Sequence, residues 1–327
     1  MTVVTATAPF APPVNGAWVA LCTKSSYLQG LLVLNHSLRS TSPPTAYPLV
    51  AMITAPFPPE AREVCRRAGI LLKEVDSLRP TEGTHELNEH DLRFMDTWTK
   101  FRAFEWTEYE RIITLDCDML VQKNMDDLFT LPLPGPDWVA GTHVCACNPR
   151  RLSHYPNDWI PENCAYTAQH LPSALTHPPL KIQPDGPRPH GLINGGLIVL
   201  TPSKTVFKDI VTFLRTSPLI KTFSFADQDL YAAFFKNHWQ PVPYVYNALK
   251  TLRVIHPDIW SDSDVRNIHY ILDKPWQHPQ GSPSKASADR STAFLHGLWW
   301  LAYEDMLSQM KLDPESGWDV VDEWVAK

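Results

Sequence analysis

The first 120 residues alternate between short apolar runs and stretches in which apolar residues recur every three or four positions. Short runs rich in β-branched residues are typical of buried strands, whereas the longer recurrence is typical of amphipathic helices. Strands are predicted at 17–23, 47–54, 70–75 and 111–116, and helices at 27–38, 58–68 and 91–106. Pro58 and Pro59 open the second helix, and Gly69 is expected to end it. This alternation predicts an α/β fold with a mostly parallel sheet, which binds ligands at the carboxyl ends of its strands.

The pattern changes between residues 131 and 189. Apolar periodicity is weak there, and 12 of the 31 prolines lie between Pro132 and Pro189. This composition predicts a long ordered loop or lid. Regular elements return afterwards, with strands predicted at 192–200 and 265–271 and helices at 203–215, 227–236 and 293–303.

Composition narrows the class of protein. Of the 327 residues, 44% are hydrophobic and 20% charged, which excludes a disordered or collagen-like chain. The net charge of −6 argues against a nucleic-acid partner. No apolar run reaches the about 18 residues of a membrane span, and the start of the chain lacks the features of a signal peptide. We therefore expect a cytoplasmic protein without a membrane partner.

The six cysteines are Cys22, Cys65, Cys117, Cys145, Cys147 and Cys164. They are sparse for this length and include no C-x-x-C pair. Neither a disulfide framework nor a zinc knuckle is therefore indicated, and reduced thiols are expected.

The most informative stretch is the apolar run that ends in Asp116-Cys117-Asp118. Residues i and i+2 of a strand face the same side, so the two carboxylates are expected to converge while Cys117 points away. Two carboxylates suit a divalent cation such as Mg²⁺ or Mn²⁺ that also contacts phosphates. The D-x-D tripeptide alone is common in surface turns. The buried strand before it favours a metal site, because unpaired carboxylates at the edge of a core are costly without a cation.

The stretch from Trp98 to Phe129 resembles the central block of the glycogenin-like sugar transferases, glycosyltransferase family 8. That block is a Thr-Lys pair, a helix, an apolar strand, D-x-D and then N-x-D-x-L-F. Further motifs follow in the order of the family: Leu21, Thr23 and Tyr27; Asn194-Gly195-Gly196; Asp227-Gln228; Tyr246-Asn247; and His269 with Lys274-Pro275-Trp276. The resemblance spans residues 17 to 276, and the stretch from Ser224 to Asp229 is more similar to the galactinol synthases than to the glycogenins.

The resemblance implies a GT-A fold, a Rossmann-like α/β architecture whose mixed, mostly parallel central sheet is flanked by helices. It implies a retaining transfer of glucose or galactose from a UDP-sugar to a hydroxyl acceptor, which is a polyol, a glycan or a protein. It also implies a metal held by Asp116, Asp118 and His269, and the imidazole ligand favours Mn²⁺ over Mg²⁺. The motifs converge on one donor site, so residues 17–327 are expected to form a single catalytic domain after a flexible leader at 1–16, with a Pro-rich insert at about 143–190. A homodimer is one option for the assembly.

The resemblance assigns roles to the remaining site residues. Its donor-binding set comprises Leu21, Thr23, Lys24, Tyr27, Lys100, Asp116, Cys117, Asp118, Asn194, Gly195 and Lys274. Lys100 and Lys274 are expected beside the phosphates, and Thr23, Lys24 and Tyr27 around uridine. Asp227 and Gln228 form the catalytic pair beneath the transferred sugar.

Simpler readings of these residues stay open. The two lysines could be solvated, and Tyr27 could pack in the core. Gly195 and Gly196 could mark a tight bend, and Asp227 could stabilise a helix N-terminus.

The chain also departs from the family pattern. Ser224 occupies the position of an Asp in the glycogenins, and the usual H-x-x-G-x-x-K-P-W is shortened and lacks its Gly, which puts Lys274 in doubt. Residues 248–268 contain no Tyr, so autoglucosylation at that site is not expected. The Pro-rich insert has no counterpart and either shapes the acceptor site or decorates the surface. The rival functions are a non-catalytic nucleotide-sugar binder and a nucleotidyltransferase.

Overall fold

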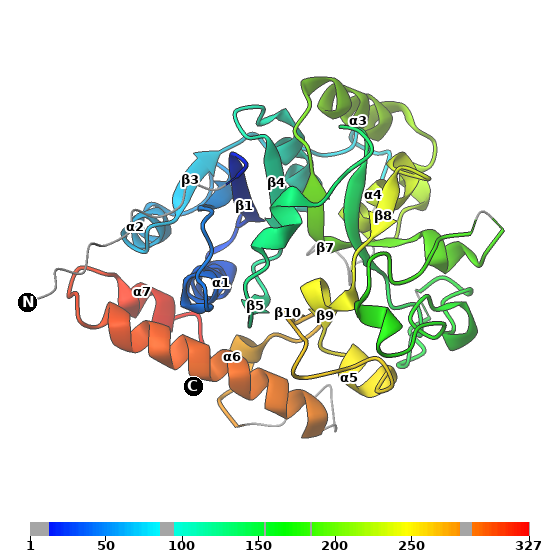
Figure 1. The fold of residues 1–327 in the computed structure, drawn as a ribbon. Helices are drawn as coiled ribbons and strands as arrows, with labels where there is room; N and C mark the ends of the chain where they lie inside the picture. Colours follow the sequence, from blue (N-terminus) through cyan, green and yellow to red (C-terminus); the bar gives the residue numbers. More distant parts are fainter. Residues whose placement is uncertain (1–12, 86–94, 154, 184, 282–289, 327) are drawn as a thin grey trace, which may run out of the picture.

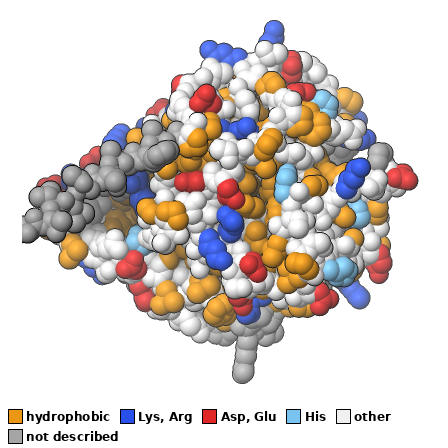
Figure 2. Space-filling model, viewed as in Figure 1, with side chains coloured by type: hydrophobic (Ala, Val, Ile, Leu, Met, Phe, Trp, Pro, Cys, Tyr) orange, Lys and Arg blue, Asp and Glu red, His pale blue; other side chains and the backbone are white. Residues whose placement is uncertain are grey.

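The computed structural model describes residues 13–326 except 86–94, 154, 184 and 282–289 (Figure 1). Most of the predicted leader at 1–16 and the start of the predicted helix at 91–106 lie outside the described residues. Acidic and basic side chains are interspersed over the face drawn in Figure 2. None of the helices in the described ranges combines the length and the apolar character that crossing a membrane requires.

A seven-stranded sheet forms the centre of the molecule, in the order β3-β2-β1-β4-β7-β6-β8. Its strands are β1 (Gly16–Leu21), β2 (Leu49–Ile53), β3 (Leu71–Glu74), β4 (Arg111–Leu115), β6 (Val139–His143), β7 (Ile193–Leu200) and β8 (Trp239–Pro241). Strand β7 runs antiparallel to β4 and β6, and the other neighbouring strands are parallel. The structure therefore confirms the mixed, mostly parallel sheet.

Helices cover both faces of the sheet (Figure 1). They are α1 (Leu28–Ser40), α2 (Pro59–Arg67), α3 (Lys204–Thr216), α4 (Ala226–Phe234), α5 (Leu252–Ile255), α6 (Arg290–Met310) and α7 (Trp318–Asp322). Successive residues of β1 alternate between two cores: Trp18 packs in the core that includes α1 and α6, and Val19 in the core that includes α3 and α4. A strand buried on both faces must be apolar throughout, which explains the continuous run in the sequence.

A small second sheet, β5-β10-β9, brings together the distant residues that were predicted to bind a metal. It consists of β5 (Met119–Val121), β9 (Ala248–Leu249) and β10 (Asn267–His269). Strand β5 begins directly after Asp118, and the register of β10 sets His269 opposite Met119. Pairing between these short strands therefore brings His269 to the end of β4.

Two predictions of secondary structure were wrong. The helix predicted at 91–106 is, in its described part, a 3₁₀ helix at Thr97–Glu105. The segment predicted as loop at 131–189 contains β6, a central strand, because its five residues VAGTH are too short and too mixed to give an apolar pattern. The segment after β6 is irregular as expected, with short 3₁₀ helices at Pro161–Asn163, Ser173–Leu175 and Arg188–Gly191.

Candidate active site

A cavity of about 310 Å³ opens at the carboxyl ends of β1 and β4, where an α/β sheet binds its ligands. Its volume falls in the range of small-molecule sites. Every residue that the sequence analysis assigned to the site lines it: Leu21, Thr23, Lys24, Tyr27, Lys100, Asp116, Cys117, Asp118, Asn194, Gly195, Asp227, Gln228, His269 and Lys274. The motifs therefore converge in space, although their individual roles stay predictions.

The carboxylates of Asp116 and Asp118 converge with the imidazole of His269. Asp116 and Asp118 lie in the turn between β4 and β5 and not on a strand, so the i, i+2 argument was wrong about their backbone. They meet because β10 delivers His269, whose Nε2 lies 3.7 Å from Asp116 Oδ2 and 3.4 Å from Asp118 Oδ1. One ligand atom from each residue lies within 4.8 Å of the other two.

A chain of amides fixes the tautomer of His269. Asn194 Oδ1 accepts a hydrogen bond from the Gly196 N–H at 3.0 Å and a second from Asn247 Nδ2 at 2.9 Å. Asn247 Oδ1 therefore faces His269 Nδ1 and accepts a hydrogen bond from its N–H at 2.8 Å. With Nδ1 bonded to Asn247, Nε2 is the ring nitrogen turned toward the carboxylates of Asp116 and Asp118. This donor set of two oxygens and one nitrogen fits a divalent cation.

Two buried lysines flank the carboxylates. Lys100 Nζ lies 2.6 Å from Asp116 Oδ1 and 2.7 Å from Asp227 Oδ2, and Lys274 Nζ pairs with Asp118 Oδ2. Burial raises the pKa of Asp116 against the opposing charge of Lys100. Burial also acts to raise the pKa of Asp118, but Lys274 and His269 outweigh it and hold that pKa below its usual range.

The charged side chains of the site favour the binding of a cation. Three carboxylates and two ammonium groups meet in the cluster, so the formal charge of these five groups is −1. A divalent cation would reverse that sign and suit the cavity to an anionic diphosphate.

Gly195 and Gly196 are required by close approach and not by a tight bend. Both lie in β7, and neither has a positive φ. A Cβ on Gly195 would lie 2.8 Å from Asp227 Oδ2, and one on Gly196 would lie 2.5 Å from His269 Cε1. The pair of glycines thus lets β7 pass directly behind the side chains of Asp227 and His269.

The residues after β1 make contacts within the protein as well as lining the cavity. Thr23 Oγ1 donates to Asp96 Oδ2 at 3.2 Å, and Lys24 Nζ lies 3.9 Å from the same oxygen. The ring of Tyr27 packs edge-on against Trp276, with centroids 5.8 Å apart. Tyr27 therefore combines the two readings that the sequence left open, because it packs in the core and faces the cavity.

The shortened loop after His269 delivers Lys274 to the cluster. Leu272 adopts a φ of +66°, a left-handed conformation in the part of the loop where the family motif has a Gly. Lys274 Nζ donates to the Tyr270 carbonyl at 2.9 Å while it pairs with Asp118. The missing Gly had put the position of Lys274 in doubt, but Lys274 reaches the carboxylates without it.

The Pro-rich insert supplies one wall of the cavity, and the sequence did not predict which of its residues form that wall. Trp159 stacks on Phe225, with ring centroids 5.0 Å apart, and Tyr155 meets Phe225 edge-on at 5.1 Å. Asn148 and Arg150 line the same cavity. The mixture of aromatic and polar residues in the insert was the available signal, and the insert does more than decorate the surface.

Comparisons with known proteins agree with the geometry. A family model described as Glycosyl transferase family 8 matches residues 18–279. Galactinol synthase 1 of Ajuga reptans is 28% identical over 288 residues, which cover 87% of this chain and 80% of the relative. Galactinol synthase 1 of Arabidopsis thaliana is 27% identical over 312 residues, which cover 93% of this chain and 84% of the relative.

Solved structures of glycosyltransferases share the fold. The galactosyltransferase LgtC, determined in complex with donor and acceptor sugar analogs, matches with a TM-score of 0.53 and 15% identity, covering 88% of this chain and 95% of LgtC. GlyE of Streptococcus pneumoniae matches with a TM-score of 0.52 and 15% identity, covering 90% of this chain but only 64% of GlyE. These matches confirm the predicted GT-A architecture.

Proposed function

The chain belongs to glycosyltransferase family 8, and from that premise we propose that it moves a hexose from a UDP-sugar to a hydroxyl acceptor, with retention and with Mn²⁺ as the metal. The observation that carries the proposal is that the amide chain directs His269 Nε2 at the carboxylates of Asp116 and Asp118. When bound there, a cation would act as a Lewis acid on the departing diphosphate. The nitrogen ligand favours Mn²⁺ over Mg²⁺.

The buried lysines support a phosphate-binding role for the cluster. Burial acts to lower the pKa of Lys100, but Asp116 and Asp227 raise it above the ordinary value, so Lys100 is charged at neutral pH. In this proposal Lys274 and Lys100 hold the negative charge of the donor while they neutralise the carboxylates. Thr23, Lys24 and Tyr27 line the part of the cavity proposed for uridine.

Asp227 and Gln228 are the proposed catalytic pair. Asp227 is buried, with one oxygen held by Lys100 at 2.7 Å, and Gln228 Oε1 accepts from Asn194 Nδ2 at 3.4 Å. Retention needs either a nucleophile beneath the sugar or a front-face route guided by the departing phosphate. A hexose found by mass spectrometry on a peptide containing Asp227 would assign the first route, and its absence after rapid quenching during turnover would assign the second.

The relatives and the cavity wall together suggest the substrates. The curated relatives are named galactinol synthases, so UDP-galactose is the first donor to test and a polyol such as myo-inositol the first acceptor. The wall formed by Tyr155, Trp159 and Phe225 offers aromatic surface to the C–H face of a ring. The amide of Asn148 is bonded to the Leu152 backbone and has one further N–H for a hydroxyl.

Release of UDP from a panel of UDP-sugars and acceptors tests the proposal. We expect turnover that needs Mn²⁺ and stops with a chelator. Asp118→Asn should lower it by at least about 100-fold, since loss of a mere orienting partner of a metal ligand already costs 10- to 100-fold. Asp209→Asn, on the exposed side of α3, is the matched control and should keep wild-type activity. Chelator-resistant turnover that Asp118→Asn leaves intact would refute the proposal.

Two further measurements separate the rivals. UDP binding in a calorimeter without transfer to any acceptor would indicate a non-catalytic binder. Pyrophosphate formed from UTP and a sugar phosphate would indicate a nucleotidyltransferase.

A further inference from the structure

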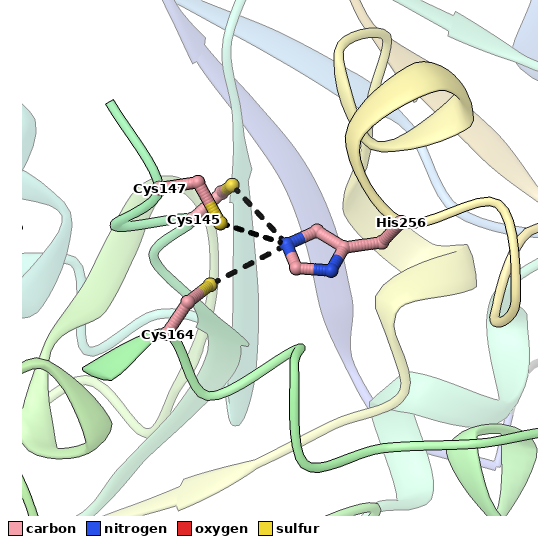
Figure 3. A group of neighbouring side chains, drawn as sticks. All are labelled: Cys145, Cys147, Cys164 and His256. Carbon is pink, nitrogen blue, oxygen red and sulfur yellow. Dashed lines mark hydrogen bonds between the residues drawn. The ribbon is translucent and has the colours of Figure 1, made fainter. Parts of the chain in front are cut away.

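A second group of metal-ligand side chains lies at the base of the Pro-rich insert (Figure 3). Cys145 and Cys147 directly follow β6, Cys164 ends the 3₁₀ helix at Pro161–Asn163, and His256 ends α5. The group shares no residue with the carboxylate cluster. Three chain segments that are distant in sequence thus bring three thiols and one imidazole to a single point.

The geometry is close to that of a tetrahedral site. In Figure 3 the three sulfurs point at His256 Nε2, at 3.7 Å from Cys145, 3.1 Å from Cys147 and 3.5 Å from Cys164. All four ligand atoms lie within 4.8 Å of one another. With Zn–S bonds of about 2.3 Å and Zn–N bonds of about 2.0–2.1 Å, a tetrahedron has N···S edges of about 3.5 Å and S···S edges of about 3.8 Å. The three observed N···S distances scatter around that value.

Hydrogen bonding alone explains the group poorly. A neutral imidazole nitrogen has one lone pair and accepts one good hydrogen bond, whereas three thiols face it. A disulfide would use two of the sulfurs and leave the third, but all three cysteines are free. A cation would satisfy all four atoms at once. Cys147 and Cys164 are buried, so a coordinated ion would be shielded from solvent.

We propose that Cys145, Cys147, Cys164 and His256 bind a structural Zn²⁺ ion. Soft thiolates with an imidazole select zinc over Mn²⁺ or Mg²⁺, and four protein ligands close the coordination sphere, as in structural and not catalytic sites. Binding forms three Zn–S bonds and one Zn–N bond, and the three thiols release their protons to solvent. The ligand chemistry of the two groups would therefore direct Zn²⁺ to the cysteines and Mn²⁺ to the carboxylates.

The zinc ion would fix a wall of the substrate cavity. Cys145 and Ile255, the neighbour of His256, both line that cavity, as does Trp159 between Cys147 and Cys164. A bond from each segment to one ion would tie the insert to the end of β6 and to α5. This inference rests on the cysteine group alone and stands whether or not the chain transfers sugars.

The metal content of the full chain tests the inference. After purification from zinc-supplemented cells under reducing conditions, we expect one zinc ion per chain by elemental analysis. Cys147→Ser and Cys164→Ser should each lower the zinc content to a small fraction. Cys65→Ala, at a buried free thiol in α2, is the matched control and should keep the full content. Asp118→Asn should keep it too, because that carboxylate belongs to the other site.

A measurement on the unmodified chain keeps the test decisive if the serine variants fold poorly. Titration with a mercurial reagent, followed with a zinc-sensitive dye, should release the zinc as the clustered thiols react. Replacement of zinc by Co²⁺ should give the sulfur-to-cobalt charge-transfer absorption and the intense visible bands of a tetrahedral thiolate site. A reduced chain that holds no zinc, an intact mass that reveals a disulfide among these cysteines, or zinc retained by both serine variants would overturn the inference.

Discussion

Replacing Gly196 with alanine tests whether the position of His269 controls metal binding. The added Cβ would lie 2.5 Å from His269 Cε1, 2.7 Å from its Nδ1 and 3.0 Å from Asn194 Oδ1. Ordinary contact begins near 3.4 Å, so the imidazole must move by about 0.9 Å. It has little freedom to do so, because the ring is buried and its Nδ1 is bonded to Asn247.

The magnitude follows from that displacement. A metal site tolerates deviations of about 0.5 Å from its working geometry. Loss of the partner that orients a metal-bound histidine typically weakens metal binding 10- to 100-fold. We therefore expect Gly196→Ala to raise the Mn²⁺ dissociation constant about 10- to 100-fold, and overpacking to lower the free energy of unfolding by about 1–3 kcal/mol.

The assay is a Mn²⁺ titration in which the free ion is measured by electron paramagnetic resonance, with urea unfolding run in parallel. Gly191→Ala is the matched control, because a Cβ there would meet nothing within 4 Å and should leave the affinity unchanged. A Gly196→Ala chain that binds Mn²⁺ within about two-fold of the wild type would refute the reasoning. If the wild type itself binds no Mn²⁺, the proposed metal site fails instead.

Two further outcomes follow from single residues. Burial, with the charge of Lys250, lowers the pKa of His296 to about 4, so the unfolded chain binds the extra proton between that value and about 6.5. The free energy of unfolding is therefore highest above about pH 6.5 and decreases as the pH is lowered, by about 2 kcal/mol at pH 5. Urea unfolding of His296→Gln should not show this decrease. Leu272, at φ +66°, should tolerate Gly but lose about 1–2 kcal/mol as Leu272→Val, whose β-branch resists that conformation, and thermal unfolding of both variants measures the difference.

The sequence predicted best where one local pattern decides the outcome. Pro59 begins α2, and Gly69, with a φ of +73°, follows its end as expected. Strand β4 and the carboxylates after it were likewise found from the apolar run and the D-x-D motif. Strand β6 was missed because its own residues form no apolar pattern. It is a strand because it pairs with β7 and β8 on its two sides.

Contacts between distant segments were beyond local patterns. The sequence motifs contained Asn247, but its bonds to His269 and Asn194 depend on β9 and β10 lying side by side. The cysteine group was missed for a similar reason. The usual spacing of paired zinc ligands is C-x-x-C, whereas Cys145 and Cys147 form C-x-C and their His256 partner lies 109 residues after Cys147.

The two sides of the cavity differ in how regular their backbone is. On one side, Asp116 directly follows β4 and His269 lies in β10, so regular strands set the positions of both side chains. On the other, an irregular segment begins at Cys147 and returns at Cys164 to the same imidazole of His256. A loop whose two ends meet at one point can exchange the residues between them at little cost to the rest of the fold. Substitutions between Cys147 and Cys164 would therefore reshape this wall of the cavity and leave the carboxylate cluster in place.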